Sequence, residues 1–396
     1  MKKLMKRVLI IEEQIKRYRR PFYQRLHNEL CHAGVQLRVV YSSPAPCETL
    51  KQDNCELPRE FGVRIEAHRI WNERLLFQPA FREVVAADLV VIDHANRFLL
   101  NHLLLPLSLL RLKKAAFWGL GENIQADRSR FSEWYKERTL NWVDWWFAYT
   151  EGTARYLQEH GVPAEKITAV QNSVDTRGIQ ISVKNLSPNA RTALRAKLGI
   201  GPSVPVGIFV GILHKVKSIP FLIKAAENIR RTIPEFELIV AGGGPDEEEI
   251  KQDASQRPWI HFVGPKFGER KSQLLAISDV FLLPGRVGLA ILDSFAAGLP
   301  LVATRLPIHG PEMEYFEEGR NGLMTAPDPE AYAQAVAILL SDPTELQLLR
   351  EGAAKSAQKY SMEVMVENFK KGIMQCLSQP KWQWSPLRWR REHSAQ

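Results

Sequence analysis

The chain has 396 residues, of which 45% are hydrophobic and 24% charged, and its formal net charge is +9. This is typical of a globular protein of roughly two to three domains, and the positive charge favours anionic partners such as phosphorylated ligands, anionic lipid or nucleic acid. The four cysteines form no C-x-x-C pair and show no zinc-ligand spacing, which argues against a disulfide framework or a zinc site.

Short β-rich runs alternate with helical patterns through the first half of the chain. Runs such as Leu89–Asp93 are almost continuous valine and isoleucine, which is typical of strands buried on both faces of a parallel sheet. Helical patterns between the runs include Pro21–Ala33 and Ser129–Leu140. The alternation predicts a doubly wound α/β domain over residues 1–180. The predicted strands are Arg7–Ile11, Gln36–Tyr41, Leu89–Asp93, Ala115–Trp118, Trp146–Tyr149 and Ile167–Val170.

Residues 181–204 are rich in proline, serine, asparagine and glycine, and we interpret them as a linker. The alternation then restarts and predicts a second α/β domain over residues 205–360. Residues 361–396 predict a C-terminal helix and a basic, tryptophan-rich tail that packs back on the first domain. The predicted strands of the second domain are Val206–Val210, Glu237–Ala241, His261–Val263, Val280–Leu283 and Leu301–Ala303, and the helices include Ser218–Arg231 and Gly288–Ala297.

The predicted fold class is therefore α/β, with two Rossmann-like doubly wound domains facing a central cleft. In sheets of this kind ligands bind at the carboxyl ends of the strands, so the cleft is the expected site.

Membrane association is a separate question. The longest apolar stretch, Phe98–Leu112, is shorter than the ~20 residues of a membrane span and contains a proline, and the apolar run at residues 8–11 is too short for a signal peptide. We expect a cytoplasmic protein. The helix at 98–112 belongs either to the core or to a membrane surface. The tail at 381–396 either packs its tryptophans on the body or binds an anionic membrane surface, which would place the protein at the inner membrane face.

The segment Leu282–Thr304 has the most chemical content. A buried strand ends in a proline and Gly285, a loop follows, and Gly288 and Leu289 start a helix. The backbone N–H groups there suit a diphosphate, and Asp293 suits ribose hydroxyls. Local physics alone slightly favours a packing glycine and a capping or exposed carboxylate.

This segment resembles the donor-binding motif of retaining GT-B glycosyltransferases of family 4. Gly288 and Leu289 match the motif, as does the stretch 297–304, and Asp293 occupies the second acidic position. Gly285 stands where the family has its first glutamate. The resemblance implies a GT-B fold and makes Asp293 a candidate for both the catalytic centre and donor binding.

Two further segments resemble the family's donor site. Residues 210–217 contain Gly211 and Lys217, which match, whereas Ile212 replaces an arginine and Lys215 is a candidate substitute for it. In the family these cations grip the donor diphosphate, where charge develops as the bond breaks. Residues 241–245 resemble the family's glycine loop over the nucleotide, and this makes Gly243 a binding candidate.

The first domain offers weaker signals. His94 follows a predicted strand, and the resemblance makes it a candidate catalytic residue near the transferred sugar, although such a histidine is more often a core or loop residue. The loop at residues 18–23 carries two arginines and lacks the glycines of a dinucleotide fingerprint. Its cations suit a phosphorylated or anionic acceptor, or form an ordinary basic surface.

The resemblance implies transfer of a sugar, with retention, from a nucleotide diphosphate sugar to a hydroxyl of a saccharide or lipid-linked acceptor. No cofactor is expected, and no Asp-x-Asp pair occurs in the chain, which fits a metal-independent site. No nucleic-acid-binding motif appears, so nucleic acid is not an expected partner. The alternatives are a catalytically weak homologue that acts as a binding partner, a nucleic-acid-binding protein and, less favoured, a nucleotide-sugar epimerase.

Overall fold

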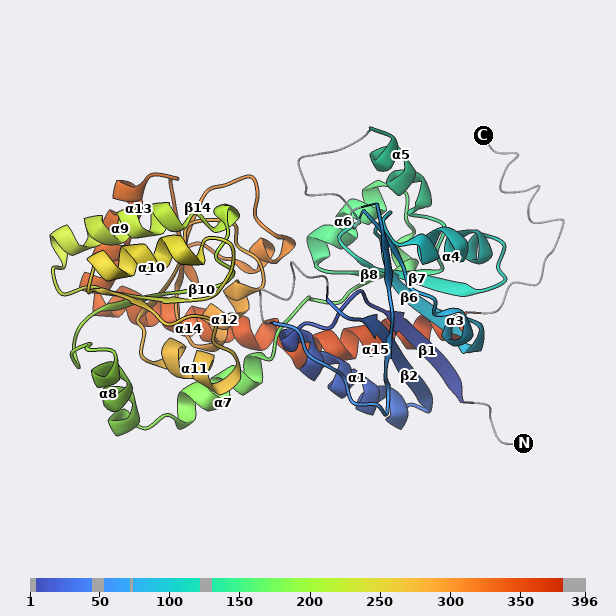
Figure 1. The fold of residues 1–396 in the computed structure, drawn as a ribbon, viewed down its shortest axis with the longest axis horizontal. Coiled ribbons are helices and arrows are strands. Elements are labelled where there is room, and N and C mark those ends of the chain that lie inside the picture. Colours follow the sequence, from blue (N-terminus) through green and yellow to red (C-terminus); the bar gives the residue numbers. More distant parts are fainter. Residues whose placement is uncertain (1–4, 45–52, 72–73, 122–129, 380–396) are drawn as a thin grey trace.

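The computed structural model describes residues 5–44, 53–71, 74–121 and 130–379 of the chain. These residues form two α/β domains that lie side by side (Figure 1), one built on a seven-stranded sheet and the other on a six-stranded sheet. The strands of both sheets pair in parallel. The predicted fold class of two Rossmann-like α/β domains is thereby confirmed.

The first sheet has the strand order β3-β2-β1-β6-β7-β8-β9. The order changes direction between β1 and β6, which is the switch point where ligands bind in such sheets. Each of the six predicted strands lies within one residue of an observed one, whereas β3 and the hairpin β4-β5 were not predicted. The strands are β1 (Lys6–Ile11), β2 (Val35–Ser42), β3 (Gly62–Ile65), β4 (His68–Ile70), β5 (Leu75–Phe77), β6 (Leu89–Asp93), β7 (Lys114–Gly119), β8 (Trp145–Ala148) and β9 (Ile167–Ala169).

Helices cover both faces of the first sheet, and each face has its own apolar core. One face packs against α1 and the other against α3, α4 and α6, so the central strands are buried on both sides, as their apolar sequences require. The helical segments are η1 (Arg17–Arg19), α1 (Arg20–His32), α3 (Phe81–Ala86), α4 (Leu99–Leu109), α5 (Arg130–Thr139), α6 (Glu151–Glu159) and η2 (Ala164–Lys166).

The second sheet has the order β12-β11-β10-β13-β14-β15, with its switch point between β10 and β13. Its strands are β10 (Val206–Val210), β11 (Glu237–Ala241), β12 (Ile260–Phe262), β13 (Val280–Leu283), β14 (Leu301–Thr304) and β15 (Gly322–Thr325). Its helical segments are η3 (Lys215–Lys217), α9 (Ile219–Thr232), α10 (Glu247–Gln256), α11 (Gly268–Ala276), α12 (Ala290–Ala296), η4 (Pro311–Tyr315), α13 (Pro329–Ser341) and α14 (Pro343–Lys359).

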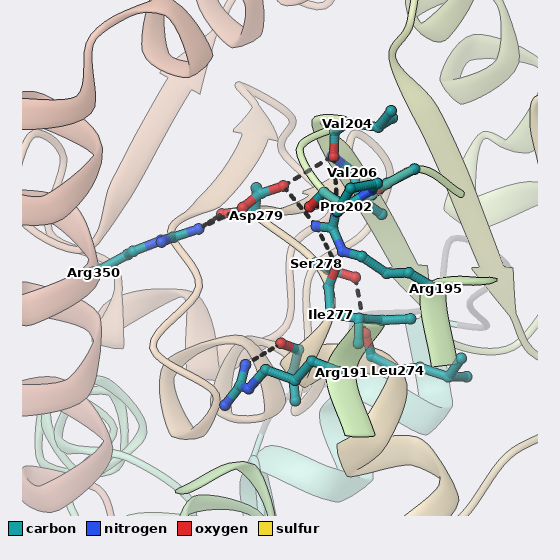
Figure 2. Close-up of polar contacts among 12 residues, drawn as sticks. Arg191, Arg195, Pro202, Val204, Val206, Leu274, Ile277, Ser278, Asp279 and Arg350 are labelled. Carbon is teal, nitrogen blue, oxygen red and sulfur yellow. Dashed lines mark hydrogen bonds and ion pairs between the residues drawn. The ribbon is translucent and has the colours of Figure 1, made fainter. Parts of the chain in front are cut away.

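The segment between the two sheets is helical. It forms α7 (Thr176–Asn185), which packs on α11 and α12, and α8 (Pro188–Lys197). Arg195 fastens α8 to the second domain by donating to the backbone oxygens of Val204 at 2.7 Å and Ile277 at 2.8 Å (Figure 2). Asp279 accepts from the backbone N–H of Val206 at 3.0 Å and from Arg350 at 2.8 Å, so α14 joins the same polar cluster (Figure 2).

The last helix, α15 (Met362–Ser378), leaves the second domain and runs along the first (Figure 1). It packs on α1, and its apolar side belongs to the core of the first domain. The ring of Phe369 stacks on that of Phe147 with centroids 4.1 Å apart and nearly parallel planes. The helix α15 therefore completes one face of the first sheet.

A second connection between the domains comes from η4. The carboxylate of Glu314 accepts hydrogen bonds from the backbone N–H groups of Glu151 at 2.9 Å and Gly152 at 2.7 Å, at the start of α6. Such an acid stabilises the free N–H groups of a helix start. The hydroxyl of Tyr315 donates to the backbone oxygen of Asn172 at 3.2 Å.

No helix of the described residues is long and apolar enough to cross a membrane. The stretch predicted as a helix at 98–112 forms α4, which buries Leu100, Leu104 and Leu105 in the first domain's core. The tail at 381–396, predicted to pack back or to bind a membrane surface, lies outside the described residues.

Candidate active site

A cavity of about 230 Å³ lies between the two domains, at the carboxyl ends of β10 and β11. We call it the interdomain cavity. The first domain contributes side chains of η1 and of the loop before β3, and the second contributes two glycine turns and the start of α12. Its lining includes Arg17, Tyr18, Asp53, Gly211, Ile212, Gly242, Gly243, Lys266, Lys271, Leu289 and Asp293.

The two glycine turns approach each other too closely for side chains. A Cβ atom on Gly242 would lie 1.9 Å from the backbone oxygen of Gly211, and one on Gly244 would lie 2.4 Å from the backbone oxygen of Leu213. Backbone groups consequently form this wall of the cavity. A wall of this kind lets an anionic ligand approach main-chain N–H groups.

An ion pair forms another part of the lining. The ammonium of Lys271, on α11, donates to the carboxylate of Asp293, on α12, at 2.6 Å. Asp293 is buried, and Lys271 neutralises its charge. A carboxylate fixed in this way can accept hydrogen bonds from the hydroxyls of a bound ligand.

Lys217 and Gly285 are in direct contact. A Cβ atom on Gly285 would lie 2.3 Å from the carbonyl carbon of Lys217, so the backbone of η3 occupies the space that a glutamate at 285 would need. The ammonium of Lys217 donates to the backbone oxygen of Arg286. Burial lowers the pKa of Lys217 to about 8, and the guanidinium of Arg286 adds to this effect. Lys217 is therefore mostly protonated at neutral pH.

A carboxylate nevertheless lies next to Gly288. It belongs to Glu312 on η4, whose Oε2 would lie 3.9 Å from a Cβ atom on Gly288. Its Oε1 accepts a hydrogen bond from the amide of Asn172 at 2.6 Å. Burial raises the pKa of Glu312 above its ordinary value, and the hydrogen bonds oppose that rise. Asn172 belongs to the chain segment between the two sheets, so this contact ties η4 to it.

A second cavity, of about 100 Å³, lies at the carboxyl ends of β1, β6, β7 and β8. We call it the first-domain cavity. It sits at the switch point of the first sheet, and Tyr18 lines both this cavity and the interdomain one. Its polar lining consists of Glu12, Gln14, Lys16, Tyr18, Arg19, Tyr23, Asp93, Trp118 and Tyr149.

The two carboxyl groups of the first-domain cavity hold their protons more tightly than usual. Burial raises the pKa of Glu12 to about 7, against the lowering effects of a hydrogen bond from Tyr23 and of the charge of Arg19. The hydroxyl of Tyr23 donates to Glu12 at 2.5 Å. Burial also raises the pKa of Asp93. Perturbed carboxyl groups in a concave site are typical of functional sites.

His94 lies in the core of the first domain and lines neither cavity. Its ring is 4.3 Å from that of Phe117 and 5.1 Å from that of Trp146, measured between centroids. Its Nε2 lies 3.1 Å from the hydroxyl oxygen of Thr139. Burial lowers the pKa of His94 to about 3, so the ring is neutral at physiological pH.

Not all of the predicted site residues lie together in the structure. Lys215 is exposed, Gly288 directly precedes the lining residue Leu289, and His94 lies apart from both cavities. The predicted residues that line the interdomain cavity together are Gly211, Gly243, Leu289 and Asp293.

Sequence reasoning missed Lys271, Glu12 and Asp93. Glu12 directly follows β1 and Asp93 ends β6, so their places at strand ends were a usable signal. Lys271 lies in an ordinary amphipathic helix, and nothing in its sequence surroundings distinguishes it.

Comparisons with known proteins agree with this architecture. Residues 204–342 match the family described as Glycosyl transferases group 1, and residues 22–177 match the one described as Glycosyltransferase Family 4. The first match covers the second sheet, and the other covers most of the first. Over both domains the chain is therefore similar to glycosyltransferases of group 1 and family 4.

Among curated relatives, the chain is 29% identical over 221 residues to D-inositol 3-phosphate glycosyltransferase of Corynebacterium urealyticum. The match covers 52% of this chain and 50% of the relative, so the chain spans about half the length of that protein. It is 26% identical over 318 residues to the α-D-kanosaminyltransferase of Streptomyces kanamyceticus. This match covers 77% of this chain and 75% of the relative.

The two-domain fold also resembles that of proteins with solved structures. The Anabaena protein HepE, crystallised with UDP-glucose, aligns with a TM-score of 0.67 and 16% identity over 93% of this chain and 99% of its own. The two parallel-sheet domains are accordingly those of the GT-B fold.

Proposed function

We propose that this chain transfers a sugar from a nucleotide diphosphate sugar to a hydroxyl group of a saccharide acceptor. The carrying observation is the interdomain cavity, in which the glycine turns after β10 and β11, Leu289 and the Lys271–Asp293 pair meet on a GT-B scaffold. The similarity to glycosyltransferases of group 1 and family 4 over residues 204–342 and 22–177 supports the reaction class.

The interdomain cavity suits the donor. Its backbone wall at Gly242 and Gly243 admits a diphosphate, and Lys266 supplies positive charge. Asp293 offers oxygen atoms to ribose hydroxyls. Lys217, protonated at neutral pH, adds charge near Gly285 and Arg286, where the leaving diphosphate gains charge as the glycosidic bond breaks.

Retention at the anomeric carbon and independence from metal ions belong to the same proposal. The acceptor hydroxyl then attacks from the face that the nucleotide leaves, and an oxygen of the leaving phosphate takes its proton. The protein positions the two substrates and stabilises charge, and residues from both domains around the cavity limit the access of water.

The proposal is tested by measuring thermal shifts with UDP, GDP, ADP and their sugars, followed by mass spectrometry and NMR of products. Lys217→Ala is expected to weaken nucleotide binding more than tenfold, which is about 1.4 kcal/mol or more, and Asp293→Asn less than that. Lys224→Ala, on the exposed side of α9, is the matched control and should change nothing. Lack of any shift with all three nucleotides, or parental behaviour of both site variants, would contradict the proposal.

A second candidate is a catalytically weak relative that binds the nucleotide and acts as a partner protein. It is favoured by Gly285, because the contact with Lys217 leaves no room for the family's first acid. Nucleotide binding without turnover on a broad acceptor panel would support this candidate over the enzyme.

The proposal includes a lipid-linked saccharide as one acceptor and an anionic membrane surface, at the cytoplasmic face, as a partner. Exposed apolar side chains beside cations suit such a surface. Leu109→Gln combined with Leu112→Gln is expected to reduce co-sedimentation with phosphatidylglycerol vesicles, and unchanged sedimentation would refute the membrane contact. The leucines exposed in and after α4 are Leu103, Leu109, Leu110 and Leu112.

A further inference from the structure

Arg19 is a buried cation on the wall of the first-domain cavity. Its side chain belongs to η1, and 8% of the residue's surface is exposed. The guanidinium has one hydrogen-bond partner among the described residues. This partner is the sulfur of Met365, a weak acceptor that lies 3.7 Å from Nη1. A guanidinium has five N–H donors, so most of its hydrogen-bonding capacity is unused.

Two other cations around the two cavities form ion pairs. Lys16 pairs with Asp53 at 2.9 Å, and Lys271 pairs with Asp293 at 2.6 Å. Within the part of the chain that the structure describes, Arg19 has no carboxylate at ion-pair distance. The charge of Glu12 acts on Arg19 from farther away. The first-domain cavity therefore holds positive charge that the described protein does not pair.

Aromatic rings hold Arg19 in place. Its guanidinium carbon lies 4.7 Å from the ring centre of Trp118, 5.3 Å from that of Tyr18 and 6.0 Å from that of Tyr149. Cation–π contacts offset part of the cost of removing the charge from water, but they do not use the N–H donors. The side chain is thus preorganised, with its donors available to a ligand.

A second buried donor in this cavity also lacks a partner. The indole Nε1 of Trp118 is buried and makes no hydrogen bond to any described residue, although Trp118 lines the cavity. Buried donors of this kind are normally satisfied, so this N–H is a second unmet polar group next to Arg19, whose guanidinium lies 4.7 Å from the Trp118 ring centre. Glu12 and Asp93 on the same wall provide acceptors for hydroxyl groups.

The cavity faces the donor site. Tyr18 lines both cavities, and Arg17, two residues before Arg19, lines the interdomain cavity. A ligand in the first-domain cavity would therefore lie beside a nucleotide sugar bound between the domains. This is where an acceptor must lie for its hydroxyl to reach the transferred sugar.

We propose that the first-domain cavity binds an anionic group of the acceptor, a carboxylate or a phosphate on a saccharide, through the guanidinium of Arg19. The assignment of this ligand as the acceptor rests on the proposed glycosyltransferase function. Arg19 is then a specificity-determining residue, because a neutral saccharide leaves its donors unpaired.

The test is a calorimetric titration of the full chain saturated with UDP. The probes are two matched sets, glucose with glucuronate and glucose 6-phosphate, and galactose with galacturonate and galactose 6-phosphate. At least one anionic member should bind tenfold or more tightly than its neutral counterpart, and comparing the carboxylate with the phosphate identifies the source of the charge. Arg19→Met should abolish this preference. Arg20→Met, at the exposed neighbouring position, should keep it.

Binding of UDP should stay within twofold of the parent in both variants, which shows that the donor site is intact. If Arg19→Met does not fold, Arg19→Lys takes its place in the test, because lysine keeps the charge and lacks the planar guanidinium. The preference for anionic over neutral saccharides should then fall severalfold. Three results would overturn this inference and leave the proposed function standing. They are equal binding of neutral and anionic saccharides, no binding of the anionic ones, and an unchanged preference for anionic saccharides in the Arg19 variants. Absence of nucleotide binding in the parent would instead refute the proposed function.

Discussion

The two cavities are built from different materials. The interdomain cavity takes much of its wall from backbone at Gly242 and Gly243, and its buried carboxylate at Asp293 is already paired with Lys271. The first-domain cavity is lined by side chains, and Arg19 in it has no such pair among the described residues. A wall of backbone groups can bind a chemical group that many substrates share. Side chains with unpaired hydrogen-bond donors can instead distinguish one ligand from another.

A side chain placed in the backbone wall of the interdomain cavity should have a larger effect than any other change proposed for the two cavities. Gly242→Val would force atoms within 1.9 Å of the backbone oxygen of Gly211, and the turn must move. We expect nucleotide binding to be lost and the free energy of unfolding to fall by about 1–3 kcal/mol. Calorimetry with UDP and chemical denaturation measure the two effects.

Gly264→Ala is the control for backbone strain. Gly264 has a φ of +70° and nothing within 4 Å of an added Cβ atom, so its substitution costs stability without closing the turns together. Equal loss of nucleotide binding in both variants would show that the close approach of the two turns is not what forms the site.

Ligand binding in the first-domain cavity should depend on pH. The pKa of Glu12 is about 7, so this carboxyl group is mostly protonated at pH 6 and mostly ionised at pH 8. Binding of an anionic saccharide such as glucuronate should therefore weaken roughly three- to tenfold over this range, because a like charge appears in the cavity. The groups whose charges act on Glu12 are Arg19, Asp93 and Glu13, and Tyr23 donates a hydrogen bond to it.

Glu12→Gln should flatten this pH dependence while UDP binding, in the other cavity, stays unaffected by the substitution. A titration of glucuronate at pH 6, 7 and 8 with parent and variant measures it. An unchanged slope in the variant would assign the dependence to another group.

The smallest effect is expected at His94. This residue lines neither cavity, and its pKa of about 3 keeps it neutral over the physiological range. His94→Gln should leave nucleotide affinity within twofold and lower the free energy of unfolding by about 1–3 kcal/mol, because a packed, hydrogen-bonded ring is lost. A large fall in turnover with normal stability would instead support the catalytic role that the sequence predicted for it.

Much of the fold was predictable because central strands such as Leu89–Asp93 are nearly continuous apolar runs. The helix α8 was missed because its serine and proline were interpreted as linker residues. Ser187 is in fact its N-cap, accepting from the backbone N–H of Ala190 at 3.2 Å, and Pro188 is its first residue. Both are equally good signals for a helix start.

The site was predictable to the extent that it is contiguous in sequence. Gly288, Leu289 and Asp293 lie in one segment, and glycine turns follow two strands, so their resemblance to the family's motifs identified these positions. The first-domain cavity draws on residues from 10 to 149, which only the folded sheet brings together. The steric reason for Gly285 depends on its contact with Lys217, which is 68 positions earlier in the chain and cannot be read from either segment.

The path of α15 has a consequence for synthesis. Met365, Phe369 and Ile373 belong to the first domain's core, yet the ribosome makes them after the entire second domain. Before α15 is made, α1 covers part of this face of the first sheet, and the part that α15 covers stays open while the second domain's strands emerge and pair. The amino-terminal domain therefore cannot be completed before the second domain has been synthesised, which departs from the usual vectorial order.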